Sequence, residues 1–359
     1  MNRLFRHIAA FALSGIILIG CAYDDTVRQL KQQADGERLA IAFSNGIIDN
    51  PVRIRTRAQA LSLLSDHTSS MGVWGWQTTP AGDVERLFLN QNVTFSTPQA
   101  KWTYNPVKYW DYRSIYRFSA YAPHSSSVTG VTATIDSVTH AISINGVTLQ
   151  GSNTIDSGVP APPANFSRVA DVDWMLDRNG QSMSGILRDE VMFNMQHILS
   201  KLSIRVCRAA NSEPDSVLKI TVDSLMIGGF VAQGDFTQSM TDDPVSMAAE
   251  WTPVDTLSRY NIMSAHNVSV PDSAVYILES LLIPQNVGAA QSIRIWYSIG
   301  NGHTSHMDHI YGLGNLFGRF ETGKSYVITI TIGPEPIRFN AGVQDWSNRE
   351  AYRQWRVND

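Results

Sequence analysis

Apolar and polar residues alternate with a period of two along the last long stretch of the chain, from Phe320 to Trp346. One side of this pattern holds Tyr326, Ile328, Ile330 and Ile332, and the other side holds Val327, Thr329 and Thr331. A period of two predicts a β-strand with one apolar face. Pro334 and Pro336 end the strand, because proline has no N–H to donate to a neighbour.

Similar alternation recurs in shorter stretches, and long helical patterns are hard to find. We predict further strands over residues 71–77, 131–135, 141–149, 218–222 and 293–297, and a strand or a pair of strands over residues 86–95. Asn145-Gly146 predicts a hairpin turn. Leu39, Ile41 and Phe43 alternate with two alanines, which predicts a first strand that ends at Asn45-Gly46. The pattern as a whole predicts an all-β fold.

The composition is that of a folded globular protein, with 43% hydrophobic and 17% charged residues. A length of 359 residues is enough for two domains of ordinary size. The formal net charge is −4 and is spread along the chain. Nothing resembles the basic patch that nucleic acid binding requires, so nucleic acid is not an expected partner.

The N-terminus has the layout of a secretory signal. Arg3 and Arg6 precede an apolar run from Ile8 to Ile19 that is too short for a membrane span. The run ends in Leu-Ile-Gly-Cys21, which resembles the lipobox of bacterial lipoproteins. We therefore predict a signal peptide over residues 1–20, acylation (palmitate) on Cys21, a polar tether over residues 21–37, and a surface-exposed outer membrane lipoprotein. The alternative is an ordinary signal peptide followed by a chance cysteine.

Aromatic residues crowd into the stretch from Lys101 to Pro123. They could form a carbohydrate-binding platform or fill the core of a sandwich, and we favour the core. His197 and Cys207 also invite a catalytic reading. A histidine beside apolar neighbours is more often a core residue, and Cys207 has no partner constellation around it.

One stretch of the sequence groups several residue types that can bind a metal. His303, His306 and His309 lie close together in the sequence with Asp308, and histidines with this spacing can share a metal when the backbone turns back. No glutamate completes a hydrolytic zinc motif. We favour a polar loop, and we predict no metal, no cofactor and no catalytic site.

Several short motifs resemble those of the fimbrillins, the subunits of type V pili in Bacteroidetes-type bacteria. They lie across most of the exported chain, and they are the FNMQHILSKLSIRV, LLIPQ, FSAYAP and GKSY stretches together with the terminal IRFNAGVQDW. The resemblance implies two tandem transthyretin-like β-sandwich domains, which we place at residues 38–188 and 189–359. It also implies a structural pilus subunit that takes part in adhesion and joins other subunits, of its own kind or paralogous, by β-strand complementation (donor-strand exchange). The alternative is a non-polymerising pilus anchor or a tip adhesin that binds a host or bacterial surface ligand.

A cluster of arginines, Arg53, Arg55 and Arg57, lies between the predicted first strand and the rest of the first domain. The segment is predicted to be exposed, as a loop or an edge strand, and exposed chain is where proteases reach. We predict a cut by an arginine-directed protease after Arg57 or Arg55. The resemblance to fimbrillins implies the same removal of the first strand, Leu39, Ile41 and Phe43, which would open a donor-strand groove. The alternative is an uncut segment in an anchor subunit.

Overall fold

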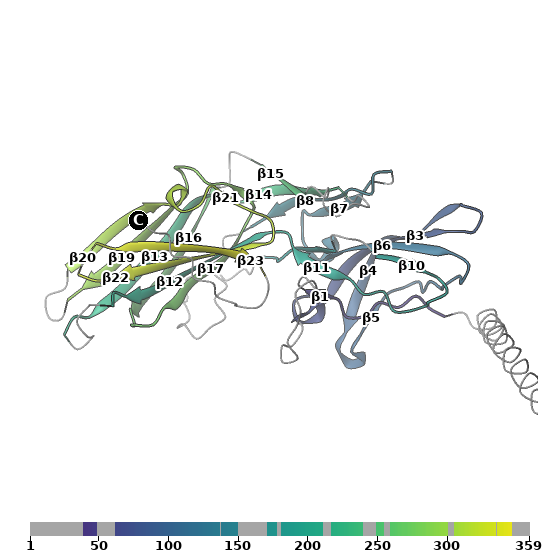
Figure 1. Ribbon diagram of the computed structural model, residues 1–359, viewed down its shortest axis with the longest axis horizontal. Coiled ribbons are helices and arrows are strands. Elements are labelled where there is room, and N and C mark those ends of the chain that lie inside the picture. The colour runs from purple at the N-terminus through teal and green to yellow at the C-terminus, as the bar shows by residue number, and fades with distance from the viewer. Residues whose placement is uncertain are drawn as a thin grey trace, which may run out of the picture.

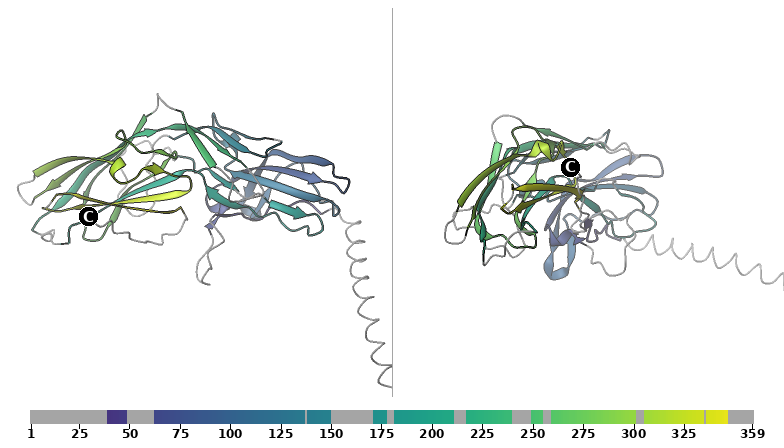
Figure 2. Two further views of the ribbon diagram at one scale, coloured as in Figure 1. Left: turned by 45° about the horizontal axis from the view of Figure 1, so that its top comes forward. Right: turned by 60° about the vertical axis from the view of Figure 1, so that its left-hand side comes forward.

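The computed structural model shows an elongated all-β protein, as the alternation predicts (Figure 1). It describes residues 39–48, 62–136, 138–149, 171–177, 181–210, 217–239, 249–254, 259–300, 305–334 and 336–346. Apart from short 3-10 turns, the regular elements in these ranges are strands. Two lobes lie end to end along the long axis (Figure 2).

The first lobe is built on one nine-stranded sheet with the order β2-β1-β11-β9-β6-β3-β4-β5, and β10 pairs with β6. Its strands are β1 (Ile47–Ile48), β2 (Ser62–Leu63), β3 (Ser70–Thr78), β4 (Val84–Ser96), β5 (Lys101–Thr103), β6 (Ile115–Ala122), β9 (Met175–Asp177), β10 (Gln181–Ser184) and β11 (Asn194–His197). The pairings are antiparallel except that of β1 with β11, which is parallel.

The second lobe is a sandwich of two four-stranded sheets, β17-β12-β22-β23 and β16-β13-β19-β20. The first contains β12 (Ser200–Arg208), β17 (Val275–Leu282), β22 (Lys324–Ile332) and β23 (Arg338–Asp345). The second contains β13 (Ile220–Val231), β16 (Arg259–Ser269), β19 (Ser292–Ile299) and β20 (Ser305–Gly312). The predicted alternation in β22 is confirmed, because Tyr326, Ile328, Ile330 and Ile332 are all buried between the two sheets. A small pair, β18 (Gln285–Asn286) and β21 (Arg319–Phe320), lies beside them.

A third sheet bridges the two lobes, with the order β15-β14-β8-β7. Its strands are β7 (Thr132–Ile135), β8 (Ile142–Thr148), β14 (Gln233–Gln238) and β15 (Ala249–Pro253). β14 continues β13 along the chain, so a strand of the second lobe runs on until it pairs with β8. Strands from both sides of residues 188 and 189 thus share this sheet, and the domain boundary placed there stays a prediction.

The buried apolar side chains form two clusters. One fills the second lobe and continues under the bridging sheet, where it includes Trp74, Trp174 and Trp251. The other lies inside the first lobe and is rich in aromatic residues. The aromatic stretch from Lys101 to Pro123 contributes five buried rings to these clusters, those of Trp102, Trp110, Tyr116, Phe118 and Tyr121. This agrees with the core interpretation of the stretch.

Two sequence-based predictions are wrong. Asn145-Gly146 lies inside β8 and makes a bulge opposite Asp235 in place of a hairpin turn. Gly146 has the positive φ of 80° that the motif favours, and its N–H donates to the Asp235 carboxylate at 2.7 Å. The polar loop predicted for residues 302–309 is also wrong from Ser305 onward, because these residues begin the edge strand β20. An edge strand with one face in water carries polar residues much as a loop does.

Candidate functional site

The candidate site is the place where residues 39–48, the N-terminal segment, insert into the first lobe. Ile41, Phe43 and Ile48 are 1%, 3% and 1% exposed, whereas Leu39 is 41% exposed. The predicted first strand is an extended chain held by two isolated bridges, with the regular strand β1 only at Ile47–Ile48. The segment is therefore part of the core of the first lobe although its neighbours along the chain lie outside the described residues.

Phe43 lies in a cage of four aromatic rings, which we call the aromatic seat. Its ring centroid is 5.7 Å from that of Phe88, 5.5 Å from Tyr104, 6.2 Å from Phe118 and 5.8 Å from Phe193. Three of these contacts are edge-to-face and the one with Phe193 is stacked, which are the geometries that aromatic pairs prefer. The four rings come from β4, β6 and two connecting stretches, so no local pattern in the sequence points to them as a group.

On one side the segment pairs with residues 108–110. The N–H of Ile41 donates to the carbonyl of Lys108 at 2.8 Å, and the N–H of Trp110 donates to the carbonyl of Leu39 at 3.0 Å. The hydroxyl of Tyr104 donates to the carbonyl of Ile41 at 2.7 Å. Burial raises the pKa of Tyr104 above its usual value, so this hydroxyl keeps its proton for the bond.

On the other side the segment runs parallel to the stretch that leads into β11. The N–H of Ser44 donates to the carbonyl of Val191 at 3.0 Å, and the N–H of Val191 donates to the carbonyl of Ala42 at 2.8 Å. β1 then continues this parallel pairing with Asn194 and Met195. Because both sides of the segment are paired, it completes the sheet as an inserted strand does.

The segment turns at Asn45, whose role the sequence did not suggest. Its amide nitrogen donates to the Ser65 hydroxyl at 2.6 Å, and its amide oxygen accepts from the Ser65 N–H at 3.1 Å and from the indole of Trp102 at 3.3 Å. The next carbonyl, that of Gly46, accepts from Leu64 at 2.8 Å. These bonds hold the end of the segment against the 3-10 turn η1 (Leu64–Asp66).

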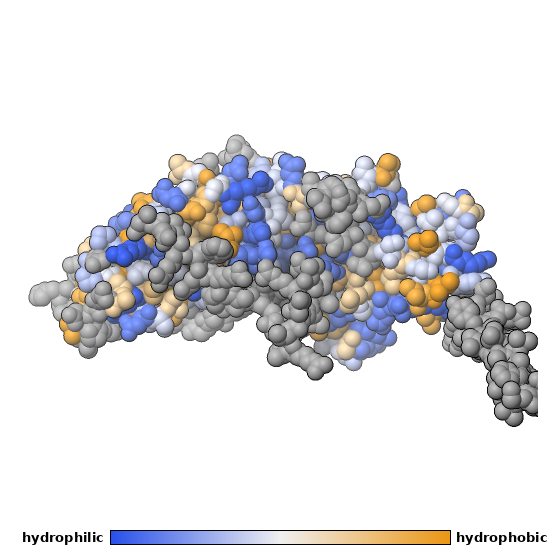
Figure 3. Space-filling model, in the orientation of Figure 1, coloured by the Kyte–Doolittle hydropathy of each residue, from blue (hydrophilic) through white to orange (hydrophobic). Residues whose placement is uncertain are grey.

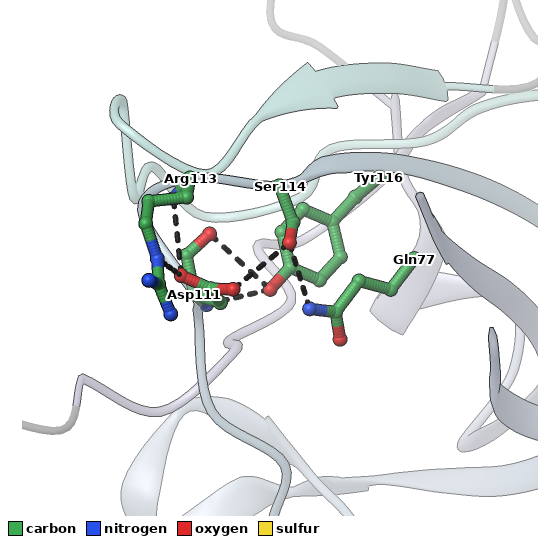
Figure 4. Close-up of polar contacts among 5 residues, drawn as sticks. All are labelled: Gln77, Asp111, Arg113, Ser114 and Tyr116. Atoms are coloured by element: carbon green, nitrogen blue, oxygen red, sulfur yellow. Dashed lines mark hydrogen bonds and ion pairs between the residues drawn. The ribbon is translucent and has the colours of Figure 1, made fainter. Parts of the chain in front are cut away.

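A polar cluster fixes the loop that carries residues 108–110 (Figure 4). The Asp111 carboxylate accepts from the N–H of Arg113 at 3.1 Å and from the Ser114 hydroxyl at 3.0 Å. The N–H of Asp111 donates to the Tyr116 hydroxyl at 2.6 Å, and Gln77 donates to Ser114 at 2.9 Å. Burial alone would raise the pKa of Asp111, but these hydrogen bonds and the Arg113 charge outweigh it and hold the pKa below its usual value.

The other candidate residues lie elsewhere. His197 is buried in β11, where its Nδ1 is 3.0 Å from an oxygen of Asp173 and its ring stacks on Trp346 with centroids 3.9 Å apart. These are the contacts of a structural residue, and they join β11 to Trp346, the residue that follows the C-terminal strand β23. Cys207 is half-buried in β12, with its Sγ 3.5 Å from the Thr331 hydroxyl.

The histidines near the C-terminus do not converge. His306 is opposite Ser298 and His309 is opposite Ile295, so the two side chains are on opposite faces of β20, and His303 lies outside the described residues. Asp308 forms a hydrogen-bonded ion pair with Arg294. The hydrogen bond lowers the pKa of Asp308 and raises the pKa of Arg294. In the described part of the chain, no three His, Cys, Asp or Glu side chains are grouped so as to hold a metal.

His306 also belongs to a serine, histidine and aspartate set, but the order is not that of a nucleophilic triad. The Ser298 hydroxyl donates to Asp223 at 2.6 Å and lies 2.9 Å from Nδ1 of His306. Because the hydroxyl proton points to the Asp223 carboxylate, the Ser298 oxygen is left to accept a hydrogen bond from His306. Histidine is therefore not placed as a base that takes the serine proton.

Cys21 and the three arginines Arg53, Arg55 and Arg57 lie outside the described residues, so the lipid site and the cutting site stay predictions. In the ranges that the structure describes, no helix is long and apolar enough to cross a membrane.

The chain is an elongated all-β protein in which a short segment near the N-terminus is paired on both sides within the first lobe. A family model described as fimbrillin-like matches residues 56–346 of this chain. The chain therefore belongs to the fimbrillin-like family, and its role is that of a subunit of a pilus, a surface appendage. No curated protein matches the chain significantly by sequence.

One solved structure supports this fold, and two others are reported beside it as similar chains. A fimbrial protein from Bacteroides vulgatus is 15% identical, with 87% of this chain and 100% of that chain covered, at a TM-score of 0.57. A candidate cell adhesion protein from Bacteroides uniformis is 16% identical over 86% and 99% of the two chains, at a TM-score of 0.46. The tip fimbrial protein Mfa3 from Porphyromonas gingivalis is 10% identical over 77% and 94%, at a TM-score of 0.35. The TM-score of the Bacteroides vulgatus protein indicates the same fold.

Proposed function

We propose that this pilus subunit is exported as an outer membrane lipoprotein through Cys21 and polymerises by strand complementation. In this proposal the N-terminal segment occupies the aromatic seat as a placeholder until a protease cuts after Arg57 or Arg55. A strand of another subunit then takes its place. The role is structural, without catalysis or a cofactor, and adhesion to host or bacterial surfaces follows from the assembled pilus.

The observation that carries the proposal is the way Phe43 and Ile41 are buried. Two nearly inaccessible side chains and several backbone hydrogen bonds belong to one short segment, and the seat around them comes from other parts of the chain. Loss of the segment would leave an apolar slot and unpaired N–H and C=O groups on both sides of it. Unpaired backbone groups beside apolar surface are what an incoming strand satisfies.

The range of the family match also supports a separation between the N-terminal segment and the part of the chain that holds the four rings. It begins at residue 56, inside the arginine cluster, so the N-terminal segment lies before it while the four rings of the seat lie within it. A part of the chain that is common to the family thus contains the slot, and the placeholder precedes that part.

The incoming strand needs an aliphatic and an aromatic side chain two residues apart, as in Ile41-Ala42-Phe43. The C-terminal strand of this chain repeats that spacing in Ile337-Arg338-Phe339. Gly342 and Val343 also follow Phe339 at the same distances at which Gly46 and Ile47 follow Phe43. β23 is an edge strand of its sheet, with Phe339 only half-buried. It is therefore a suitable donor for a second copy, whereas residues 347–359 lack a regular apolar alternation.

N-terminal sequencing of protein extracted from the cell surface tests the proposal. Assembled material is expected to begin at or near Ala58, and an Arg55→Ala, Arg57→Ala double variant is expected to accumulate as an unpolymerised lipoprotein. Cys21→Ala is expected to release the protein or block its processing. Assembled pili whose subunits still begin at acylated Cys21 would contradict the placeholder role.

The second candidate function is a pilus anchor or tip adhesin that keeps its N-terminal segment. The observation that favours it is the polar character of residues 347–359, in which only Tyr352, Trp355 and Val357 are large and apolar. An anchor is expected to retain residues 39–48 in mature pili, so the same sequencing experiment separates the two functions.

A further inference from the structure

The outer end of the first lobe presents apolar side chains to solvent. Ile115 is 58% exposed, Ile186 69% and Leu187 60%, and Leu39 and Tyr109 are 41% and 47% exposed at the same end. We call these five residues the outer patch. Figure 3 shows hydrophobic residues gathered at this end of the molecule. A group of exposed apolar residues at one place marks an interaction surface, whereas single ones do not.

The backbone joins the members of the outer patch. Ile115 at the start of β6 is paired with Ser184 at the end of β10, and Ile186 and Leu187 follow in the next turn. The N–H of Gly185 donates to the carbonyl of Ser114 at 2.9 Å, which brings this turn against the Asp111 loop. The same loop carries Tyr109, which forms a bridge with Ala40 beside Leu39.

The patch includes the point at which the chain leaves the described structure toward its N-terminus, because Leu39 is the first described residue. From the structure we propose that the outer patch docks on the membrane surface while the subunit is still lipidated. This inference rests on the proposed acylation of Cys21. Cys21 is 18 residues before Leu39, so the tether can extend to at most about 65 Å. Short tethers keep the patch at a high effective concentration beside the bilayer.

The side chains suit a bilayer interface. Aliphatic residues can enter the boundary between headgroups and acyl chains, and a tyrosine at the rim places its ring and hydroxyl at headgroup depth. Beside the patch, the charged groups of Asp111 and Arg113 bond to each other. The five side chains of the patch carry no charge, so contact through them does not depend on anionic lipid.

A membrane fits the patch better than a neighbouring subunit does. Leu39 belongs to the segment that the proposed cut removes, so the complete patch exists only before assembly. At that stage the chain is still anchored, and the bilayer is the surface within its reach. The cut that frees the lipid would also remove Leu39 from the patch.

The test uses the full-length lipoprotein reconstituted in phosphatidylcholine and phosphatidylethanolamine vesicles that carry a lipid-borne quencher. A fluorophore is attached at Ile186→Cys in a Cys207→Ser background, and the control label is at Ile310→Cys, a position 60% exposed on the second lobe. We expect quenching at position 186 to exceed that at position 310 by about threefold or more, as apolar contact with the interface requires. Leu187→Asp is expected to remove the difference, and Val138→Asp, at a site 84% exposed, is expected to leave it unchanged.

Equal quenching at the two positions in vesicle-bound protein would overturn the docking surface and leave the lipid anchor standing. Quenching that grows with protein density and comes with cross-links between copies would assign the patch to a neighbouring subunit instead. Mass spectrometry of the Cys21 peptide is read separately. An unacylated Cys21 would refute the lipid anchor and, with it, this proposal.

Discussion

Phe43→Ala is the change that probes the N-terminal segment most directly. The side chain is 3% exposed and contacts four aromatic rings. Truncation of a buried phenylalanine costs about 3–5 kcal/mol. Since each 1.4 kcal/mol is a factor of ten, the equilibrium constant for release of the segment should rise between about a hundredfold and a few thousandfold.

The assay is hydrogen exchange of the amides that the segment buries. The N–H groups of Ile41 and Ser44 are bonded to Lys108 and Val191, so they exchange only when the segment leaves its place. Phe43→Ala is expected to speed their exchange while the amides of β22 in the second lobe stay as protected as before. Leu39→Ala, at a position 41% exposed, is the matched control and should change stability by about 0.5 kcal/mol or less.

One result would refute this reasoning. If Phe43→Ala destabilised β22 as much as the amides of Ile41 and Ser44, the segment would open only with global unfolding. It would then be an integral part of the core and not a placeholder that can leave by itself.

Three further predictions concern the loop beside the seat and the sheet that bridges the two lobes. Asp111→Asn should lower the free energy of unfolding by less than about 1 kcal/mol at neutral pH, measured in urea, because the carboxylate is partly solvated. The pKa of Asp111 is lowered in the folded state, so the carboxylate stabilises the fold above the ordinary pKa near 4. The difference between the two proteins should therefore vanish as the pH falls through the folded pKa. Gly146→Ala should lower the melting temperature by more than Gly82→Ala does. Both glycines have positive φ, but a Cβ at position 146 would lie 2.5 Å from the Gly130 carbonyl oxygen, whereas a Cβ at position 82 would meet no atom within 4 Å. Equal shifts would show that the positive φ alone determines the cost. Trp251→Phe should lower the free energy of unfolding by about 1–3 kcal/mol in chemical denaturation. The change leaves the buried Ile198 carbonyl without the indole N–H of Trp251, whose nitrogen lies 2.7 Å from the carbonyl oxygen. An unchanged denaturation midpoint would show that this hydrogen bond does not stabilise the contact between the lobes.

The sequence was informative wherever a single strand decides the pattern. The alternation from Tyr326 to Ile332 predicted both the strand β22 and its buried face. It could not predict which strands pair, because a period of two assigns a face and not a partner. The pairing of β8 with β14 and the parallel pairing of the N-terminal segment with Val191 connect distant parts of the chain, so neither appeared in the local pattern.

The alternation likewise predicted only part of the candidate site around the N-terminal segment. Ile41 and Phe43 were expected to face the core and do so, but Leu39, which shares their alternation, lies at the edge of the sheet where water reaches it. Asn45 was expected only to end the first strand, while its amide in fact holds the segment to Ser65 and Trp102. The misreading of Asn145-Gly146 has a similar cause, since the motif expresses a preference for positive φ that a bulge satisfies as well as a turn.

A cut in the arginine cluster could open the seat without any change in the contacts that the structure shows. While the chain is intact, residues 49–61 keep the segment beside its place at an effective concentration on the order of millimolar. After a cut, the segment is a separate peptide whose concentration is that of the protein, on the order of micromolar or less. The difference of about a thousandfold corresponds to about 4 kcal/mol, similar to the effect expected for loss of the Phe43 ring. Cleavage and Phe43→Ala should therefore produce comparable opening, and a donor strand tethered to a neighbouring subunit regains the local concentration that the placeholder has lost.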